Sequence, residues 1–163
     1  MKDKTKIAIY PGTFDPITYG HIDIIKRTSN IFDKVFVIIG KNSMKRNLFT
    51  DKERLEMAQQ ATYNIENCEV IISNELTTEI AKKLKAKTII RGIRAVSDFD
   101  YEFQIALINK KLAPDIHTLF MVPDEKYIYL SSSIVKELAM YNKNINKFVP
   151  DEVAKKLFEK LKK

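Results

Sequence analysis

Five short runs rich in isoleucine and valine alternate with segments of helical spacing along this chain of 163 residues. We predict strands at residues 6–10, 34–39, 68–72, 88–91 and 118–122. We predict helices at residues 20–30, 51–63, 78–84, 98–112, 132–141 and 151–162. Strands that alternate with helices favour a parallel sheet with right-handed crossover connections. The sequence therefore predicts an α/β fold: a Rossmann-like, doubly wound parallel sheet in a single domain, residues 1–163, with C-terminal helices.

Two of the predicted helices carry additional signals. Thr50 precedes the helix at residues 51–63, and Glu53 follows Thr50 by three positions, which is the spacing of a capping box. The helix at residues 98–112 has acidic residues in its first turn and apolar side chains at helical spacing. These apolar residues are Phe99, Phe103, Ala106 and Leu107.

The positive net charge of the chain is compatible with a nucleic acid or with a small anionic ligand. The formal net charge is +7, and residues 143–163 hold seven lysines against three carboxylates. A basic terminal helix is usually a solvated face, and this one lacks the alternation of aromatic and basic residues that stacks nucleic-acid bases. We therefore expect no nucleic-acid partner, and the remaining positive charge suits a small anionic ligand.

Other features of the composition favour a cytoplasmic protein without a membrane partner. The polar first six residues lead directly into a strand, which is unlike a signal peptide. The longest plain apolar stretch, residues 35–39, is far shorter than a membrane span. Cys68 is the single cysteine, so the chain can form no internal disulfide, and no cluster of cysteine and histidine suggests zinc.

The segment from Tyr10 to His21 connects the first predicted strand to the first predicted helix. It holds two prolines and two glycines, which force a tight and stiff turn. His21 then falls on the first turn of the helix, where free backbone N–H groups and the positive end of the helix dipole favour a phosphate. Thr13 adds a hydroxyl donor. A capping or surface role for His21 is the alternative, but this setting favours a histidine that donates to a phosphate oxygen.

The glycines of the chain point to the same edge of the predicted sheet. In parallel sheets of this type, ligands bind beyond the carboxyl ends of the strands. The chain has four glycines: Gly12, Gly20, Gly40 and Gly92. Three follow or end a predicted strand and the fourth opens the first helix, so we expect the backbone to approach a ligand closely there.

Three further clusters fall on this edge. Residues 40–46 form a basic loop, which is either an exposed polar loop or a source of positive charge near a transferring phosphoryl group. In residues 89–94 two arginines bracket a glycine, a pattern that suits a phosphate, unless the arginines pair with Asp98 or Glu102. Residues 127–133 end in three serines at a predicted helix start, where serine either binds an anion or simply caps the helix.

Several common catalytic motifs are missing from the sequence. It contains no P-loop, no Gly-x-Gly-x-x-Gly segment and no Gly-x-Ser-x-Gly elbow. It offers no evident nucleophile or acid–base pair. We therefore expect catalysis by positioning and by stabilisation of charge, as in phosphoryl or nucleotidyl transfer by in-line displacement.

The motifs together resemble a known family. The segment from Tyr10 to Pro16, followed by Thr18-Tyr19-Gly20-His21, is similar to the (His/Thr)-x-Gly-His motif of the nucleotidylyltransferase superfamily. Within that superfamily the chain resembles the bacterial phosphopantetheine adenylyltransferases, through residues 90–102 and 131–137 as well. Motif order and spacing match over essentially the whole chain.

The resemblance implies a reaction and a set of site residues. ATP and 4′-phosphopantetheine would give dephospho-coenzyme A and pyrophosphate, with Mg²⁺ held largely by the ATP phosphates, in a homohexamer. His21 and Lys45 would be catalytic, His21 by stabilising the pentacovalent transition state. ATP would be bound by Thr13, Phe14, His21, Gly92, Ile93, Arg94, Glu102, Tyr127, Ile128, Tyr129, Leu130, Ser131, Ser132 and Ser133. Phosphopantetheine would be bound by Thr13, Lys45, Thr77 and Arg91, with Thr77 along the pantetheine arm.

Four positions depart from common usage in the family. Ser43 stands where proline is frequent, Thr77 where an apolar residue is usual and Tyr127 where tryptophan can occur. Lys136 replaces the arginine of the serine motif in the wider superfamily. The first three affect packing of the substrate arm and loop stiffness more than the chemistry.

Two other functions compete with this interpretation. One is a related cytidylyl- or adenylyltransferase with another phosphorylated substrate, such as glycerol phosphate or nicotinate mononucleotide. Lys45 and the segment from Arg91 to Glu102 disfavour it, because they match the pantetheine enzymes. The other is a nucleic-acid-binding module without catalytic activity, which would show strong, salt-dependent binding to RNA or DNA.

Overall fold

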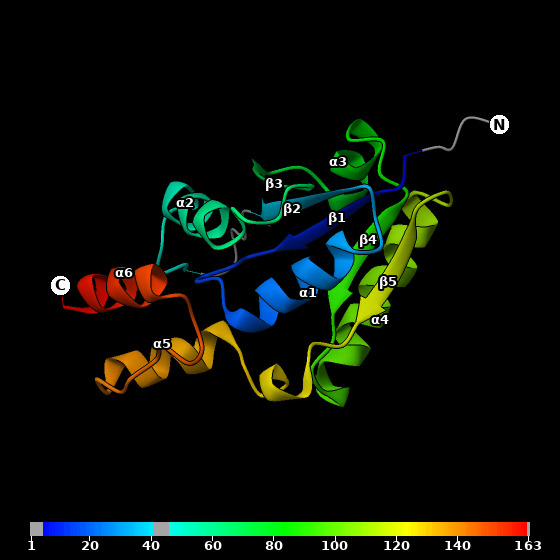
Figure 1. The fold of residues 1–163 in the computed structure, drawn as a ribbon. Coiled ribbons are helices and arrows are strands. Elements are labelled where there is room, and N and C mark those ends of the chain that lie inside the picture. Colours follow the sequence, from blue (N-terminus) through cyan, green and yellow to red (C-terminus); the bar gives the residue numbers. More distant parts are fainter. Residues whose placement is uncertain (1–4, 41–45, 163) are drawn as a thin grey trace.

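The computed structural model describes residues 5–40 and 46–162, which form a parallel sheet with helices on both faces (Figure 1). The strands are β1 (Ile7–Gly12), β2 (Lys34–Gly40), β3 (Cys68–Ser73), β4 (Thr88–Gly92) and β5 (His117–Met121). The helices are α1 (Tyr19–Ser29), α2 (Asp51–Ala61), α3 (Thr77–Lys83), α4 (Val96–Leu112), the 3₁₀ helix η1 (Glu125–Tyr127), α5 (Ser132–Met140) and α6 (Asp151–Leu161). All strand pairs are parallel, in the order β3-β2-β1-β4-β5.

Alternate residues of the strands serve the two faces of the sheet. Tyr10 on β1 belongs to the larger hydrophobic core, which also takes residues from α1, α2, α5 and α6. Ile9, its neighbour on the strand, belongs to a second core with residues of α3 and of the turn after α4. Figure 1 shows α1 and α4 on opposite faces of the sheet. Both faces are therefore buried, which confirms the doubly wound architecture predicted from the sequence.

The predicted elements are all present, with small shifts at their ends. β1 continues two residues past the predicted end because Pro11 and Gly12 still pair with Ile38 and Ile39 of β2. The capping box at Thr50 is confirmed, since the Glu53 N–H donates to Thr50 Oγ1 and the Thr50 N–H donates to Glu53 Oε2. The 3₁₀ helix η1 was not predicted, because three residues are too few for a periodic signal. No helix within the described ranges has the length and apolar character that a membrane span requires.

Helix α4 exposes apolar side chains instead of burying them. Phe99, Phe103 and Leu107 are 41%, 44% and 55% exposed, although they stand at helical spacing. Asn109 is the single buried residue of α4 within the described chain. Leu119 on β5, the edge strand beside this helix, is also exposed. An apolar surface of this kind usually marks an interaction site.

The C-terminal helix α6 is tied to α2 by ion pairs. Lys160 Nζ donates to both carboxylate oxygens of Glu53, at 2.8 and 2.9 Å. Lys156 reaches Glu56 one turn further along α2, at 3.4 Å. Hydrogen bonding to Lys160 is the main cause that lowers the pKa of Glu53 from its ordinary value of 4.5 to about 2. Because the same carboxylate caps α2, this pair joins the end of the chain to the helix that follows the basic loop.

We expect Lys160→Gln to lower the free energy of unfolding at pH 7 by about 0.5–1 kcal/mol, the usual range for a partly exposed pair. The pair stabilises the fold where Glu53 is ionised. Its contribution is complete above pH 4.5 and is lost as the pH falls toward about 2. Urea denaturation of both proteins at several pH values should therefore show a difference that closes in this window.

Lys155→Gln is the matched control for this experiment. Lys155 is exposed on the same helix and has no carboxylate within ion-pair distance among the described residues. A difference for Lys160→Gln that did not change with pH, or one equal to that of Lys155→Gln, would contradict the assignment.

Candidate active site

A cavity of about 610 Å³ opens at the carboxyl ends of β1, β2 and β4. All four glycines of the chain line it, as expected from their predicted place at this edge. The cavity lies where the strand order reverses direction, because β1 has β2 on one side and β4 on the other. This is the position at which ligands bind in open α/β sheets.

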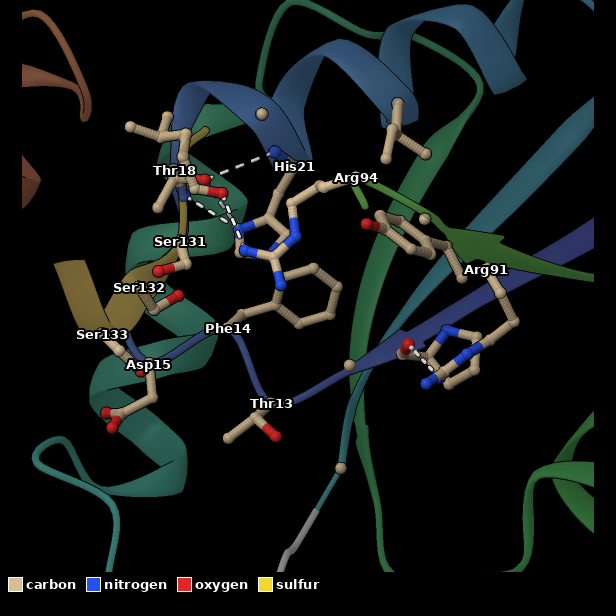
Figure 2. Close-up of a pocket in the computed structure, with 18 of the residues that line it drawn as sticks. Thr13, Phe14, Asp15, Thr18, His21, Arg91, Arg94, Ser131, Ser132 and Ser133 are labelled. Carbon is tan, nitrogen blue, oxygen red and sulfur yellow. Dashed lines mark hydrogen bonds between the residues drawn. The ribbon is translucent and has the colours of Figure 1, made fainter. Parts of the chain in front are cut away.

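The turn after β1 is stiff and tightly packed. Phe14 is 3% exposed and has a φ of 50°, in the left-handed region that few side chains adopt. Its ring packs edge-on against Tyr10 and His21, with centroids 5.4 and 5.0 Å away. A Cβ on Gly12 would lie 2.8 Å from the Phe14 ring, so a larger residue would displace it. The turn thereby places both Thr13 and His21 in the lining of the cavity (Figure 2).

His21 uses one ring nitrogen to cap its own helix. Nδ1 accepts a hydrogen bond from the backbone N–H of Thr18 at 3.1 Å, and Thr18 Oγ1 lies 3.1 Å from the same nitrogen. The Thr18 side chain accepts from the His21 N–H in return. Nδ1 must therefore be unprotonated, which leaves the proton of the neutral ring on Nε2. The capping role and the phosphate-binding role, which were alternatives from the sequence, use different nitrogens and are compatible.

The surroundings of His21 favour the neutral ring. Burial is the main cause that lowers the pKa of His21 from 6.5 to about 4, and the positive charge of Arg94 adds to the effect. At neutral pH the side chain is thus an uncharged donor through Nε2–H. It can stabilise negative charge that develops on a phosphate oxygen, but it has little capacity to act as an acid.

Arg91 combines an ion pair with free donor capacity. Its Nη2 donates to Glu102 Oε1 at 2.6 Å, its Nε donates to Glu102 Oε2, and its Nη1 donates to the Pro11 carbonyl at 3.0 Å. The ion pair was the alternative considered for the arginines of residues 89–94, and the structure contains it. Among the described residues, three of the five N–H donors of this guanidinium have partners, so two N–H groups are available to a ligand.

Arg94 links the end of β4 to the serine segment. Its Nη1 donates to the Leu130 carbonyl at 2.9 Å, and its Nε donates to Asp98 at 3.2 Å. Ser131 caps α5 by accepting from the Ile134 N–H, and Ser132 Oγ donates to the Pro16 carbonyl. In Figure 2, Ser131, Ser132 and Ser133 lie to one side of His21 and Arg91 to the other.

The structure brings together most of the predicted residues but not all of them. The cavity is lined by Thr13, Phe14, His21, Arg91, Gly92, Arg94, Glu102, Leu130, Ser131, Ser132 and Ser133. The predicted residues that do not line it are Ile93, Thr77, Tyr127, Ile128 and Tyr129. Thr77 opens α3, and Tyr127 stacks on Tyr19, the first residue of α1. Lys45 lies outside the described residues, so its role stays a prediction from the resemblance.

Sequence reasoning missed an acid that holds the cavity wall together. Asp15 is 5% exposed and accepts from the N–H groups of Leu48 and Phe49 and from Lys136 Nζ, each at 2.9 Å. It thereby joins the turn after β1 to the start of α2 and to α5. Its place in the turn was visible in the sequence, but its partners are 33 to 121 positions away.

A second missed residue is Arg54, whose side chain is fully buried behind the cavity. It donates to the backbone carbonyls of Thr13 and Gly40 and to Asp51. One signal could have revealed it. Arg54 stands three and four positions before Met57 and Ala58, on the face of α2 that enters the core. A charged residue at a core position calls for a specific partner.

Comparison with known proteins gives a consistent assignment. The model of the cytidylyltransferase-like family matches residues 9–138. A phosphopantetheine adenylyltransferase of Caldanaerobacter subterraneus subsp. tengcongensis is 54% identical over 158 residues, which cover 97% of this chain and 99% of that protein. A protein of the same name from Dictyoglomus thermophilum is 50% identical over 153 residues, covering 94% and 93%.

Solved structures agree on the fold. One from Vibrio parahaemolyticus, assigned as a nicotinate-nucleotide adenylyltransferase, matches with a TM-score of 0.70. The match covers 97% of this chain and 95% of that one, at 17% identity. At such low identity the likeness supports the shared fold and nothing about the substrate.

We expect His21 to titrate with a pKa of about 4 and to carry its neutral-state proton on Nε2. Correlation of ring protons with ring nitrogens by NMR, between pH 3 and pH 8, measures both properties. The sign for stability follows. In the unfolded chain this residue is protonated near pH 6.5, whereas in the folded chain it is protonated only near pH 4. The free energy of unfolding therefore decreases as the pH falls from 6.5 to 4.

His117, the other histidine of the chain, is exposed and gives the second set of imidazole signals. His117→Gln assigns the two sets. A His21 midpoint near 6.5, or a proton on Nδ1 in the neutral ring, would contradict the capping geometry.

Proposed function

This chain belongs to the cytidylyltransferase-like family and, within it, to the phosphopantetheine adenylyltransferases, and we propose how its cavity carries out their reaction. The enzyme transfers the adenylyl group of ATP to 4′-phosphopantetheine, giving dephospho-coenzyme A and pyrophosphate. A phosphate oxygen of phosphopantetheine forms a bond to the α-phosphorus of ATP, and the bond from that phosphorus to the oxygen shared with the β-phosphate breaks. The attacking phosphate is already anionic, so the step requires no general base.

The observation that carries this mechanism is the neutral His21 ring on the cavity wall. Nδ1 is occupied by Thr18, so Nε2–H is the donor available to a ligand. The transition state places extra negative charge on the oxygens of the α-phosphate. A donor fixed in advance toward those oxygens stabilises the transition state more than the ground state. We assign this role to His21.

The remaining groups of the cavity bind and orient the two substrates. Thr13 contacts ATP and orients the attacking phosphate, and Arg91 holds that phosphate with its two remaining N–H groups. Arg94 and the serines at the start of α5, which it joins through the Leu130 carbonyl, bind ATP. The proposal retains Lys45 as a second ligand of the phosphopantetheine phosphate, on the resemblance alone.

Mg²⁺ would reach the cavity on the phosphates of ATP, and there it would supply positive charge to the leaving pyrophosphate. The two carboxylates that line the cavity already have partners: Asp15 has two amides and Lys136, and Glu102 has Arg91. Within residues 5–40 and 46–162 there is no group of three side chains of the types that bind metals. These residues therefore fit a metal that is held mainly by the substrate.

We test the activity by release of pyrophosphate. The protein should release it with ATP and 4′-phosphopantetheine together, and much less when CTP replaces ATP or nicotinate mononucleotide replaces phosphopantetheine. His21→Ala should lower kcat by about 10²–10³-fold, the range for loss of one preorganised donor to a charged transition state.

His117→Ala is the control, since it removes an exposed imidazole at the start of β5 and should keep full activity. Circular dichroism verifies that both variants are folded. Absence of turnover with ATP and phosphopantetheine would refute the function, whereas full activity of His21→Ala would refute the role of the histidine.

We also propose that the protein assembles as the homohexamer that its family resemblance implies, and that it acts in the cytoplasm. The exposed apolar side chains of α4 and β5 support self-association. Eight apolar side chains form this surface, and each is more than 40% exposed in the single chain: Val96, Phe99, Tyr101, Phe103, Leu107, Ile108, Leu112 and Leu119. A second copy of the chain would cover this surface. The surface reaches the cavity, because Tyr101 belongs to both and the neighbouring Glu102 also lines the cavity.

Sedimentation velocity should give a mass about six times the 18.9 kDa of one chain. Leu107→Glu should shift the protein to smaller species, because it places a charge in the apolar surface. Gln60→Glu adds the same charge to an exposed position of α2 and should leave the mass unchanged. A monomeric wild-type protein at micromolar concentration would overturn the proposal.

A further inference from the structure

The buried side chain of Arg54 lies at the end of the paired segment of β1 and β2. The two strands pair in register up to Gly12 and Ile39. The next residues are Thr13, which follows β1, and Gly40, the last residue of β2, which still pairs with Ser73 of β3. The carbonyls of Thr13 and Gly40 both accept a hydrogen bond from the same atom, Nη1 of Arg54, at 3.1 Å for Gly40. Nη1 of Arg54 thus joins the two segments one residue beyond the last pair of β1 and β2.

The side chain of Arg54 is itself firmly held. It is 0% exposed, and its Nη2 donates to Asp51 Oδ1 at 2.7 Å one turn earlier on α2. The start of α2 is in turn joined to the turn after β1, because Asp15 accepts from the amides of Leu48 and Phe49. The guanidinium can therefore move very little relative to Thr13.

Core packing alone does not explain a charge at this position. Transfer of a guanidinium out of water is costly, and replacement of a buried ionic group by an apolar one of similar size is often neutral or stabilising. The helix already places Met57 and Ala58 in the same core, where they are 1% and 0% exposed. Arg54 Nε has no hydrogen-bond partner among the described residues, so hydrogen bonds do not fully offset the cost of removing the guanidinium from water.

We propose that Arg54 is a positioning residue for adenylyl transfer. It fixes the spacing between the turn that carries Thr13 and the end of β2, from which the basic loop begins. Arg54 itself does not line the cavity, so it acts through the backbone of these two segments. The inference rests on the proposed function, because Thr13 is there the residue that orients the attacking phosphate toward ATP.

Arg54→Met tests the proposal, since it keeps a long side chain and removes every donor. Loss of alignment lowers the rate of the chemical step more than it weakens binding. We expect kcat for pyrophosphate release to fall by about 10–100-fold, a range typical of small misplacements of reacting groups. The KM for each substrate should change by less than about threefold, because every group that touches the substrates is still present.

Arg54→Lys separates charge from geometry. Its single ammonium keeps the charge but can stand in the place of Nη1 or of Nη2 and not of both, so it cannot bond the two carbonyls and Asp51 at the same time. We expect it to fold, and to recover only part of the kcat lost in Arg54→Met. Complete recovery by lysine would overturn the proposal, because charge alone would then be enough.

Met57→Ala is the control for general destabilisation. It removes buried volume from the same helix one turn further along, and it should lower the melting temperature while kcat per folded molecule stays within about twofold of wild type. The proposal fails if Arg54→Met has wild-type kcat, or if Met57→Ala loses as much kcat as Arg54→Met. Failure of the proposed function looks different, since the wild-type protein would then not turn over the two substrates.

A measurement on the unchanged chain covers the case in which the arginine variants do not fold. With arginine labelled by ¹⁵N and carbonyls by ¹³C, couplings across the two hydrogen bonds should join Arg54 Nη1 to the carbonyl carbons of Thr13 and Gly40. They should persist when both substrates are bound. Their loss in the substrate complex would overturn the proposal.

Discussion

The central place of β1 in the parallel sheet is the constraint on which the cavity depends. β1 pairs with β2 on one side and β4 on the other, so the loops after three strands converge where β1 ends. Each strand end brings a different group: the segment after β1 brings Thr13 and leads to His21, β2 ends at Gly40, and β4 ends with Arg91 and Gly92. In another strand order these groups would lie at separate points of the sheet edge, and two substrate phosphates could not meet between them.

Buried and partly buried charges join the described segments at this edge of the sheet. Asp15 accepts hydrogen bonds from two backbone amides and from Lys136, Arg54 donates to two backbone carbonyls and to Asp51, and Arg91 donates to Glu102. A charged group that is desolvated must find its partners in the protein. Loop backbone, whose polar groups also need partners, supplies most of them here. The backbone N–H and C=O groups of the segments around the cavity thus also serve as the partners of the charged side chains that stabilise these segments.

His21 shows how one side chain serves both structure and chemistry. The capping bond of Nδ1 fixes the tautomer, and burial beside Arg94 keeps the ring neutral. A neutral imidazole with its proton on Nε2 suits a reaction in which an anionic phosphate attacks and no proton needs to be removed. The same low pKa makes the residue a poor general acid or base. The environment therefore selects charge stabilisation among the roles open to a histidine.

The sequence by itself determined the class of fold, the edge of the sheet at which ligands bind and the segments that meet there. These follow from short-range properties: the spacing of apolar residues, the prolines and glycines of one turn, and motifs such as the segment from Tyr10 to His21. Only the tertiary structure decided that Asp15 and Arg54 brace this edge, that Thr77 and Tyr127 stand outside the cavity, and that α4 leaves its apolar side chains exposed. The reason is physical. A hydrogen bond or an ion pair between residues far apart in the chain leaves no periodic trace in the sequence, and an apolar stripe has the same spacing whether the core or another surface covers it.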